Sequence, residues 1–262
     1  CLFMRYLFLV AGTTLLYLVG VADDLVGVGY RYKFVVQILS ASFLSLSGLW
    51  INDLGGLLGL HAIPAFIGMP LTIFLVVYIT NAINLIDGID GLASGLTCIA
   101  LGLLIIVCIF VGQWTHALLA SATLGVVATF YYYNVFSVSG RKLFMGDAGS
   151  LTLGYILSFL ILHFWTRQES WDPFELNLNM VTISTLLIPL LDVVRVFYSR
   201  AKDGRNPFLP DKNHIHHKLL RTGIRVRTVM ITLLLLSLFL VVANFLLSFY
   251  INATFMLLFD LV

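Results

Sequence analysis

Four short polar segments interrupt an otherwise apolar sequence, and each carries side chains that could bind a metal ion or a phosphate group. The first holds two adjacent carboxylates, Asp23 and Asp24, at the end of an apolar run, with Arg31 and Lys33 close behind. Acids at the C-terminal end of a helix oppose the helix dipole, so this pair costs stability unless a cation compensates it. A bound metal ion or a cationic group of a substrate would do so, whereas the structural alternative is a solvated helix end.

The second segment, N-A-I-N-L-I-D-G-I-D-G-L, carries a polar side chain at every third position: Asn81, Asn84, Asp87 and Asp90. On one continuous helix this spacing makes a polar stripe that drifts about 60° per step. Charged residues in a membrane are costly, by about 2.5 to 3.5 kcal/mol at the membrane centre on insertion scales, so they usually mark a functional site. Hydrogen bonding between helices would explain the two asparagines alone.

The third segment, F-M-G-D-A-G-S, places Asp147 immediately before an apolar run. Asp147 could simply cap a helix, as aspartate often does. However, Gly146 and Gly149 would let a ligand approach the backbone, where the N–H groups of a helix N-terminus favour phosphate. Arg141 and Lys142 add positive charge nearby.

The fourth segment lies in a basic loop over residues 199–228, where His214, His216 and His217 fall within four residues. The loop also contains Lys202, Arg205, Lys212, Lys218, Arg221, Arg225 and Arg227. Attraction to anionic lipids would explain the cations but not the histidines, which suit phosphate binding or metal ligation. Zinc is the rival metal, but no cysteine lies near, and the many carboxylates favour Mg²⁺ or Mn²⁺.

The composition indicates which scaffold must hold these segments. Hydrophobic residues make up 60% of the 262 residues and charged residues 11%, and the mean hydropathy is +1.00; soluble domains carry roughly 25% charged residues. A water-soluble globule is thereby excluded, and we expect an all-α polytopic membrane protein in which residues 1–262 form a single domain. Apolar runs predict about eight or nine transmembrane helices. Their approximate spans are 6–22, 34–50, 65–83, 92–112, 117–135, 149–165, 179–198, 229–247 and, for a short ninth, 250–262.

The charges are distributed unevenly between the two sets of loops that alternating spans create. Of the 15 Lys and Arg residues, 13 lie in or beside the loops 23–33, 84–91, 136–148 and 199–228. The positive-inside rule makes this set cytoplasmic. Because the same set holds all four polar segments, we expect the chemistry at the cytoplasmic face. Carboxylates able to hold Mg²⁺ and a basic histidine loop able to hold phosphates are equipment for phosphoryl transfer, and an apolar groove beside them could hold a lipid.

The four segments, in this order, resemble the polyprenyl-phosphate N-acetylhexosamine-1-phosphate transferase family, of glycosyltransferase 4 type. The matching strings are D-D at 23–24, N-A-I-N-L-I-D-G-I-D-G-L at 81–92, F-M-G-D-A-G-S at 144–150 and H-I-H-H at 214–217. The resemblance implies transfer of a sugar-1-phosphate from a UDP-N-acetylhexosamine to undecaprenyl phosphate in the bacterial inner membrane, with release of UMP and a requirement for Mg²⁺. Membrane lipids and a homodimer are the other partners it implies, and no nucleic acid is expected.

The resemblance also implies roles for individual residues. Asp147 would be a metal ligand with Asn84 beside it, and the expected catalytic group is Asp23, Asp24, Asp87, Asp90, His214, His216 and His217. The expected substrate-binding group is Asn81, Asn84, Arg141, Lys142, Lys212 and Arg221. Members of the family have further spans before the Asp-Asp pair. Those spans do not occur here, and apolar runs lie almost directly at both ends, so we expect this sequence to be part of a longer protein.

Several alternatives stay open at this point. The H-I-H-H string preceded by N-P-F-L-P-D-K resembles the branch that uses UDP-GlcNAc to initiate O-antigen, enterobacterial antigen or teichoic acid, whereas the alternative within the family is the branch that makes peptidoglycan lipid I. Outside the family, an ion-coupled transporter also uses intramembrane acids, although it predicts acids distributed through the bilayer. A purely structural membrane subunit would tolerate the loss of Asp147.

Overall fold

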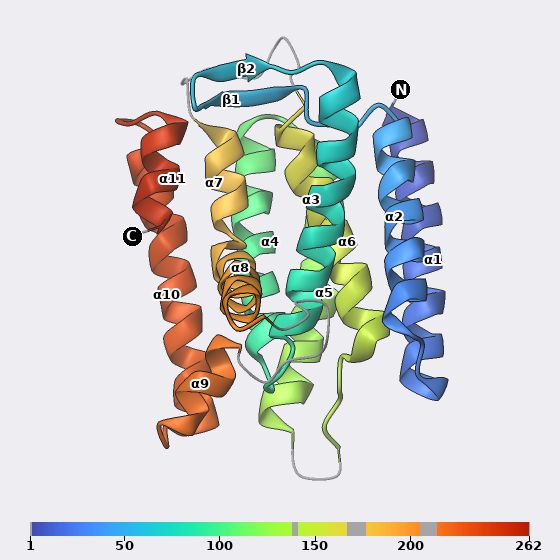
Figure 1. The fold of residues 1–262 in the computed structure, drawn as a ribbon, viewed down its shortest axis with the longest axis vertical. Coiled ribbons are helices and arrows are strands. Elements are labelled where there is room, and N and C mark those ends of the chain that lie inside the picture. Colours follow the sequence, from blue (N-terminus) through green and yellow to red (C-terminus); the bar gives the residue numbers. More distant parts are fainter. Residues whose placement is uncertain (1, 138–140, 167–176, 205–213, 262) are drawn as a thin grey trace.

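The computed structural model describes residues 2–137, 141–166, 177–204 and 214–261. These residues form a bundle of helices that carries one β-hairpin at one end (Figure 1). The elements are α1 (Leu2–Val26), α2 (Tyr30–Leu46), β1 (Asp53–Leu57), β2 (Leu60–Ala62), α3 (Ala65–Ile86), α4 (Leu92–Phe110), α5 (Trp114–Phe136), α6 (Gly146–Phe164), α7 (Leu178–Ser184), α8 (Leu187–Lys202), α9 (Ile215–Arg221), α10 (Val226–Leu247) and α11 (Ala253–Leu261).

Within the described residues, six helices are long and apolar enough to cross a membrane, or seven if α7 and α8 form one span. The six are α1, α3, α4, α5, α6 and α10. The expected class, a helical polytopic membrane protein, is thus supported, whereas the expected count of eight or nine is not. The differences lie in α2, which has 17 residues, and α11, which has nine.

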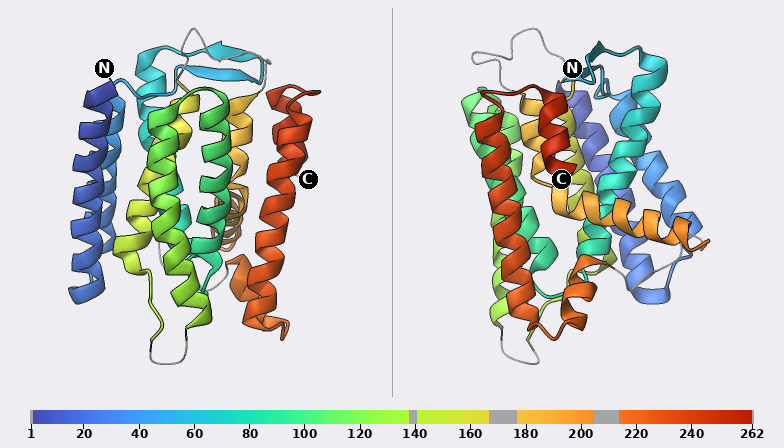
Figure 2. Two further views of the ribbon diagram at one scale, coloured as in Figure 1. Left: turned by 180° about the vertical axis from the view of Figure 1, so that it is seen from behind. Right: turned by 60° about the vertical axis from the view of Figure 1, so that its left-hand side comes forward.

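The predicted span 179–198 is broken, because α7 and α8 meet at an angle of 73°. In the right-hand view of Figure 2, α8 runs sideways out of the bundle. The break has two local causes. Pro189 has no N–H to donate to the carbonyl four residues earlier, and the hydroxyls of Ser184 and Thr185 bond the carbonyls of Val181 and Thr182 at 2.7 and 2.8 Å.

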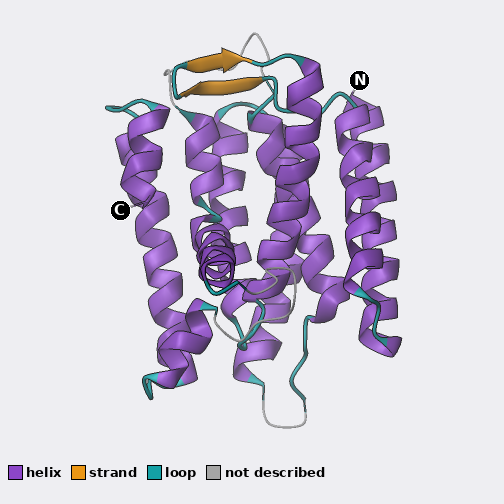
Figure 3. Ribbon diagram, viewed as in Figure 1, coloured by secondary structure: helices purple, strands orange, loops and turns teal. Residues whose placement is uncertain are grey.

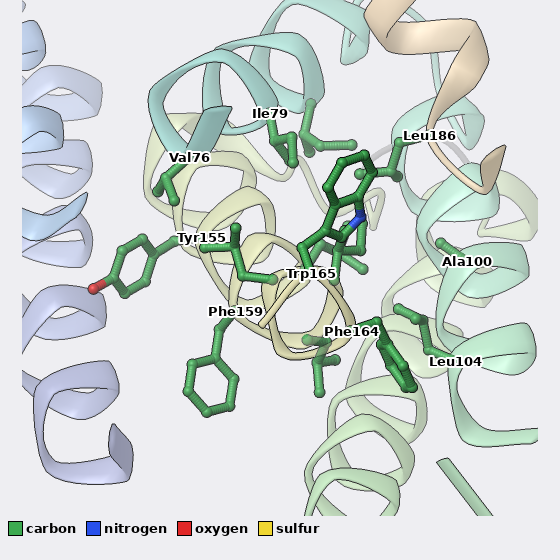
Figure 4. Packing of buried hydrophobic residues seen from close by; sticks show 14 of the residues in the cluster. Val76, Ile79, Ala100, Leu104, Tyr155, Phe159, Phe164, Trp165 and Leu186 are labelled. Atoms are coloured by element: carbon green, nitrogen blue, oxygen red, sulfur yellow. The ribbon is translucent and has the colours of Figure 1, made fainter. Parts of the chain in front are cut away.

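The helix α6 forms the centre of the bundle. Every residue from Leu157 to Phe164 is buried, as expected of a helix that is apolar on all sides. Figure 4 shows Tyr155, Phe159 and Phe164 of this helix among side chains of its neighbours. Glycines allow the backbones to approach closely: a Cβ on Gly20 of α1 would lie 2.4 Å from the Cα of Ala148. The N-terminus of α6, which carries Asp147, is therefore held firmly against α1.

The hairpin was not predicted. β1 and β2 pair antiparallel, and the turn between them places Leu58 at φ 54° and Gly59 at φ 75°, the left-handed region that tight hairpin turns use. Figure 3 shows these two strands at the end of the bundle opposite α9. The Leu58 N–H donates to the Thr254 hydroxyl at 2.8 Å, which ties the hairpin to α11. The all-α expectation thus needs this one correction, away from the polar segments.

Candidate active site

The carboxylate of Asp147 lies where α2, α3 and α6 meet. Its Oδ2 is 2.6 Å from Lys33 Nζ of α2, and its Oδ1 accepts a hydrogen bond from Asn84 Nδ2 of α3 at 3.0 Å. Asn84 also donates to the Ser150 hydroxyl at 2.9 Å, which fixes the orientation of its amide. The structure therefore brings together two of the predicted residues, Asn84 and Asp147, and adds a lysine to them.

The adjacent acids Asp23 and Asp24 make different contacts. Asp24 accepts the backbone N–H groups of Asp147 and Ala148 at 2.9 and 3.2 Å, so it caps α6 from a different helix. Gly146, at φ 62°, makes room for this contact, because a Cβ there would lie 2.5 Å from Asp24 Oδ2. The capping role considered for Asp147 thus belongs to Asp24.

Asp23 accepts the backbone N–H of Val28 at 2.6 Å and pairs with Lys33 Nζ at 3.0 Å. Lys33 thereby bridges Asp23 and Asp147, residues that are 124 positions apart in the sequence. The sequence argument required a cation beside the Asp23–Asp24 pair, and in this structure the Lys33 ammonium is one. The sequence analysis treats Lys33 only as a nearby charge. Its position near the start of the helix that follows the Asp23–Asp24 pair could have indicated this contact.

The polar stripe from Asn81 to Asp90 does not lie on one helix, because α3 ends at Ile86 and α4 starts at Leu92. A short loop between the two helices carries Asp87 and Asp90. Asn134 of α5 holds this loop: its Oδ1 accepts the Gly91 N–H at 2.6 Å and its Nδ2 donates to the Leu143 carbonyl at 2.7 Å. Lys142 Nζ pairs with Asp90 Oδ2 at 2.6 Å. The role of Asn134 was missed, since an isolated asparagine near a helix end gives no pattern.

The carboxyl group of Asp87 lies in an unfavourable place for a negative charge. Burial, followed by the charges of Asp147 and Asp90, raises the pKa of Asp87 to about 6. The influence of Asp147 on this pKa also shows that the loop and the start of α6 are electrostatically close. A cation bound here would stabilise the ionised form of Asp87.

This raised pKa predicts how stability depends on pH. A folded-state pKa of about 6, above the ordinary 3.8, means that protonation of Asp87 favours the folded state. The resulting stabilisation is complete below the unfolded pKa and is lost as the pH rises through the folded one. The variant Asp87→Asn, which stays neutral, should therefore melt at a higher temperature than the wild type near neutral pH, and the difference should vanish in acid. Thermal unfolding in detergent without divalent cations measures this; a difference that is constant with pH would contradict it.

The histidine segment meets the loop that carries Asp87. The ring of His216, on α9, lies against Gly88 so closely that a Cβ on Gly88 would be 2.1 Å from Nε2. His216 is 1% exposed, and neither ring nitrogen has a hydrogen-bond partner among the described residues. Burial, then the neighbouring His217 and His214, lowers the pKa of His216 to about 4, so the ring is neutral near neutral pH. The rings of His216 and His217 lie 4.2 Å apart.

A methyl group at Gly88 should disturb this contact. The variant Gly88→Ala is expected to lower turnover by about 100-fold, because displacing reacting groups by about 1 Å has effects of that size. Gly102→Ala is the matched control, since a Cβ on Gly102 would meet nothing within 4 Å. The release of UMP that the sequence resemblance implies, measured with each purified variant, tests this prediction. Equal loss in both variants would show that the effect is not specific to the histidine contact.

The remaining predicted residues lie at the edge of this cluster. Asn81 is one helical turn from Asn84 and exchanges hydrogen bonds with Gln37, at 2.6 and 3.3 Å. Arg141 and Arg221 are exposed, and Lys212 lies outside the described residues. The structure therefore brings the acids and Asn84 close to the histidine segment. The catalytic, metal-binding and substrate-binding roles of all the predicted residues, Asn84 and Lys142 included, stay predictions.

The site offers oxygen donors for Mg²⁺ but no closed cage of protein ligands within the described residues. Among the described residues, no three or more His, Cys, Asp or Glu side chains are arranged as a metal cage. Mg²⁺ is, however, usually bound by one or two carboxylates together with substrate phosphates and water. The carboxylates of Asp147 and the nearby Asp87 are hard oxygen donors that fit this mode, and burial together with neighbouring acids raises the pKa of Asp87. Asn84 directs its amide nitrogen at Asp147, so its oxygen would serve as a ligand only from the other side of the amide.

These helices and this site define a multi-pass membrane protein that gathers carboxylates, lysines and histidines at one end of its bundle. Comparison with known families then places it more narrowly. The chain belongs to glycosyl transferase family 4, whose model matches residues 6–164. The resemblance drawn from the four sequence segments is thereby confirmed.

Three curated relatives of the chain have closely similar names. The chain is 33% identical over 225 residues to the undecaprenyl-phosphate alpha-N-acetylglucosaminyl 1-phosphate transferase of Yersinia pestis. The matched region covers 84% of this chain and 60% of that protein. It is 32% identical over 221 residues to the protein of that name from Escherichia coli strain K12, with 82% and 59% covered. A probable undecaprenyl-phosphate N-acetylglucosaminyl 1-phosphate transferase of Bacillus subtilis strain 168 is 31% identical, with 86% and 61% covered. The chain thus spans about three fifths of the length of these relatives.

Proposed function

We propose that this protein transfers N-acetylglucosamine-1-phosphate from UDP-GlcNAc to undecaprenyl phosphate and releases UMP, at the cytoplasmic face of a bacterial inner membrane. The observation that carries the proposal is the convergence of Lys33, Asp147, Asn84 and the His216–Gly88 contact at one end of a membrane bundle. The names of the relatives supply the acceptor and the sugar. The product would initiate a cell-envelope polysaccharide.

The proposed reaction is a direct displacement at phosphorus. An oxygen of the undecaprenyl phosphate attacks the β-phosphorus of UDP-GlcNAc, the new P–O bond forms, and the bond to the UMP oxygen breaks. A phosphate monoester has its second pKa near 6, so the acceptor is mostly dianionic at neutral pH and a strong general base is not required. Asp23 accordingly serves to orient Lys33, and Asp24 serves to hold the start of α6.

The side chains of the cluster supply positioning and charge. Lys33 and Lys142 bring ammonium groups to the place where the diphosphate would gain negative charge, and His216 offers ring nitrogens for hydrogen bonds. Asp147 and Asn84 would hold Mg²⁺, which would neutralise charge on the diphosphate. The position of the acids favours this reading over a transporter, because the four acids Asp23, Asp24, Asp87 and Asp147 gather at one end.

The proposal is tested by supplying the purified protein with undecaprenyl phosphate and a panel of UDP-sugars. We expect UMP and a diphosphate-linked lipid product with UDP-GlcNAc, and only in the presence of a divalent cation. Product with UDP-MurNAc-pentapeptide instead would assign the lipid I branch. Movement of a solute across liposomes without UMP release would support a transporter. Rapid-quench labelling that trapped a phosphorylated protein would overturn the direct displacement. The homodimer remains a prediction that cross-linking in the membrane can address.

A further inference from the structure

Asp192 is a buried acid that the proposed reaction does not use. It lies on α8, five residues into that helix, and is 3% exposed. Its Oδ1 accepts hydrogen bonds from Arg195 Nη2 at 2.6 Å and Nε at 3.2 Å, and from the backbone N–H of Ile215 at 2.9 Å. Its Oδ2 is 2.8 Å from His214 Nδ1. One carboxylate thus joins α8 to the start of the histidine segment.

These contacts determine which ring nitrogen of His214 carries a proton. The guanidinium of Arg195 and the N–H of Ile215 can only donate, so they stabilise the ionised carboxylate, which can only accept. The Nδ1 atom of His214 must therefore be the donor in its contact with Asp192. This leaves Nε2 as the one ring atom of His214 that can accept a hydrogen bond or take up a further proton.

The position of His214 also affects the other histidines of the H-I-H-H segment, residues 214–217. His214 is 4% exposed, and its ring lies parallel to that of His216, with 5.9 Å between the centroids and 6° between the planes. His216 in turn lies against Gly88, beside Asp87. Because Asp192 also holds the N–H of Ile215, the first residue of α9, it fixes both the ring of His214 and the backbone that carries the other two histidines.

We propose that Asp192 is a positioning residue of the transfer site: it holds His214 in the Nδ1–H form and so presents Nε2 for contact with the phosphate groups of the sugar nucleotide. The identity of that ligand rests on the proposed function, whereas the contact with His214 does not. Asp192 itself touches no substrate. Among the described residues, Asp192 and Arg195 of α8 and His216 and His217 of α9 are the charged and titratable groups that these contacts link to His214.

The simplest rival role for Asp192 is structural. Asp192 and Arg195 are three residues apart on α8, so their ion pair could serve only to stabilise that helix. Such a pair would not depend on His214, and its loss would destabilise the protein whether or not His214 were present. The two roles therefore differ in two measurable ways, the tautomer of His214 and the coupling between the two side chains.

The tautomer is measured by solid-state NMR of ¹⁵N-histidine-labelled protein in lipid nanodiscs, with the His214 signals assigned by their loss in His214→Gln. We expect the Nδ1–H signature in the wild type and its loss in Asp192→Asn. The matched control Asp203→Asn, an exposed acid just beyond the end of the same helix, should keep it. An unchanged tautomer in Asp192→Asn would overturn the proposal. If that variant does not fold, the wild-type spectrum is sufficient, because an Nε2–H signature for His214 would also overturn it.

The coupling is measured by a double-mutant cycle on UMP release. Asp192→Asn should lower kcat roughly 10- to 100-fold, the usual effect of removing a residue that orients a functional histidine. In the His214→Gln background the same change should have less than about a twofold further effect, because the two side chains act together. Full additivity would assign Asp192 a structural role only. If the wild type released no UMP from any donor, the proposed function would fail, and the NMR result would still decide the role of Asp192.

Discussion

Asp147→Asn is expected to reduce UMP release strongly while leaving the helix bundle intact. The change removes the charge that pairs with Lys33 at 2.6 Å and the oxygen donor that we assign to Mg²⁺. A loss of about 100- to 1000-fold in kcat is expected, as for other groups that stabilise charge in a transition state. The fold should survive, because the cap of α6 comes from Asp24 through the backbone N–H groups of residues 147 and 148, which the substitution retains.

The prediction is checked by measuring UMP release and thermal unfolding on the same preparations. Asp203→Asn serves as the control for the change of acid to amide, since Asp203 is exposed and lies outside the cluster. Near-normal turnover by Asp147→Asn at saturating Mg²⁺ would remove Asp147 from the site. A collapse of the melting temperature would instead give Asp147 a structural role, whereas a purely structural subunit would tolerate the substitution.

The sequence was sufficient to predict the class of the fold and the acids, Asn84 and histidines of the cluster, but not the contacts of Lys33 and Asn134. Long apolar runs indicate membrane helices. Acids at the ends of such runs indicate a functional site, because placing a charge in or near the membrane costs free energy. The order of the loops then placed all four polar segments on one side. The structure agrees, because Asp147 contacts both Asp24 and Asn84 although the three residues come from distant segments.

The roles of individual acids could not be predicted in this way. Asp23 and Asp24 are adjacent and chemically identical, but one faces an ammonium group and the other the N-terminus of α6. That division depends on the direction in which two neighbouring side chains leave α1 and on a helix that begins more than a hundred residues later. The break at Ser184 is a local feature that Pro189 could have signalled, whereas the contact between His214 and Asp192 is purely tertiary.

The ion pairs of the two lysines are a further feature of the site that the sequence alone could not predict. Lys33 and Lys142 each contact an acid that comes from another segment, so each appears in the sequence as one more cation beside a membrane span. In the folded chain the two lysines lie among five acids, Asp23, Asp24, Asp87, Asp90 and Asp147, so the cluster carries an excess of negative charge before any ligand binds. A substrate diphosphate and a divalent cation add opposite charges to it, so binding of the one should favour binding of the other.

Lys33→Met is expected to have opposite effects on cation binding and on turnover. In the wild type, the ammonium group is 3.0 Å from Asp23 Oδ2 and 2.6 Å from Asp147 Oδ2, so a divalent cation that uses Asp147 must compete with it. Removing the ammonium leaves two carboxylates without that cation, which favours a metal ion in its place. We expect the affinity for Mn²⁺, measured by its EPR signal without substrate, to rise about tenfold, a change of about 1.4 kcal/mol.

Turnover by Lys33→Met should nevertheless fall by about 100-fold even at saturating Mg²⁺, because the positive charge that would face the transferred phosphoryl group is gone. Lys202→Met is the matched control: Lys202 is an exposed lysine in the last turn of α8, and both quantities should keep their wild-type values there. Weaker Mn²⁺ binding by Lys33→Met would mean that the lysine helps to build the cation site rather than compete for it. Unchanged turnover would mean that the bridge between Asp23 and Asp147 only holds α1, α2 and α6 together.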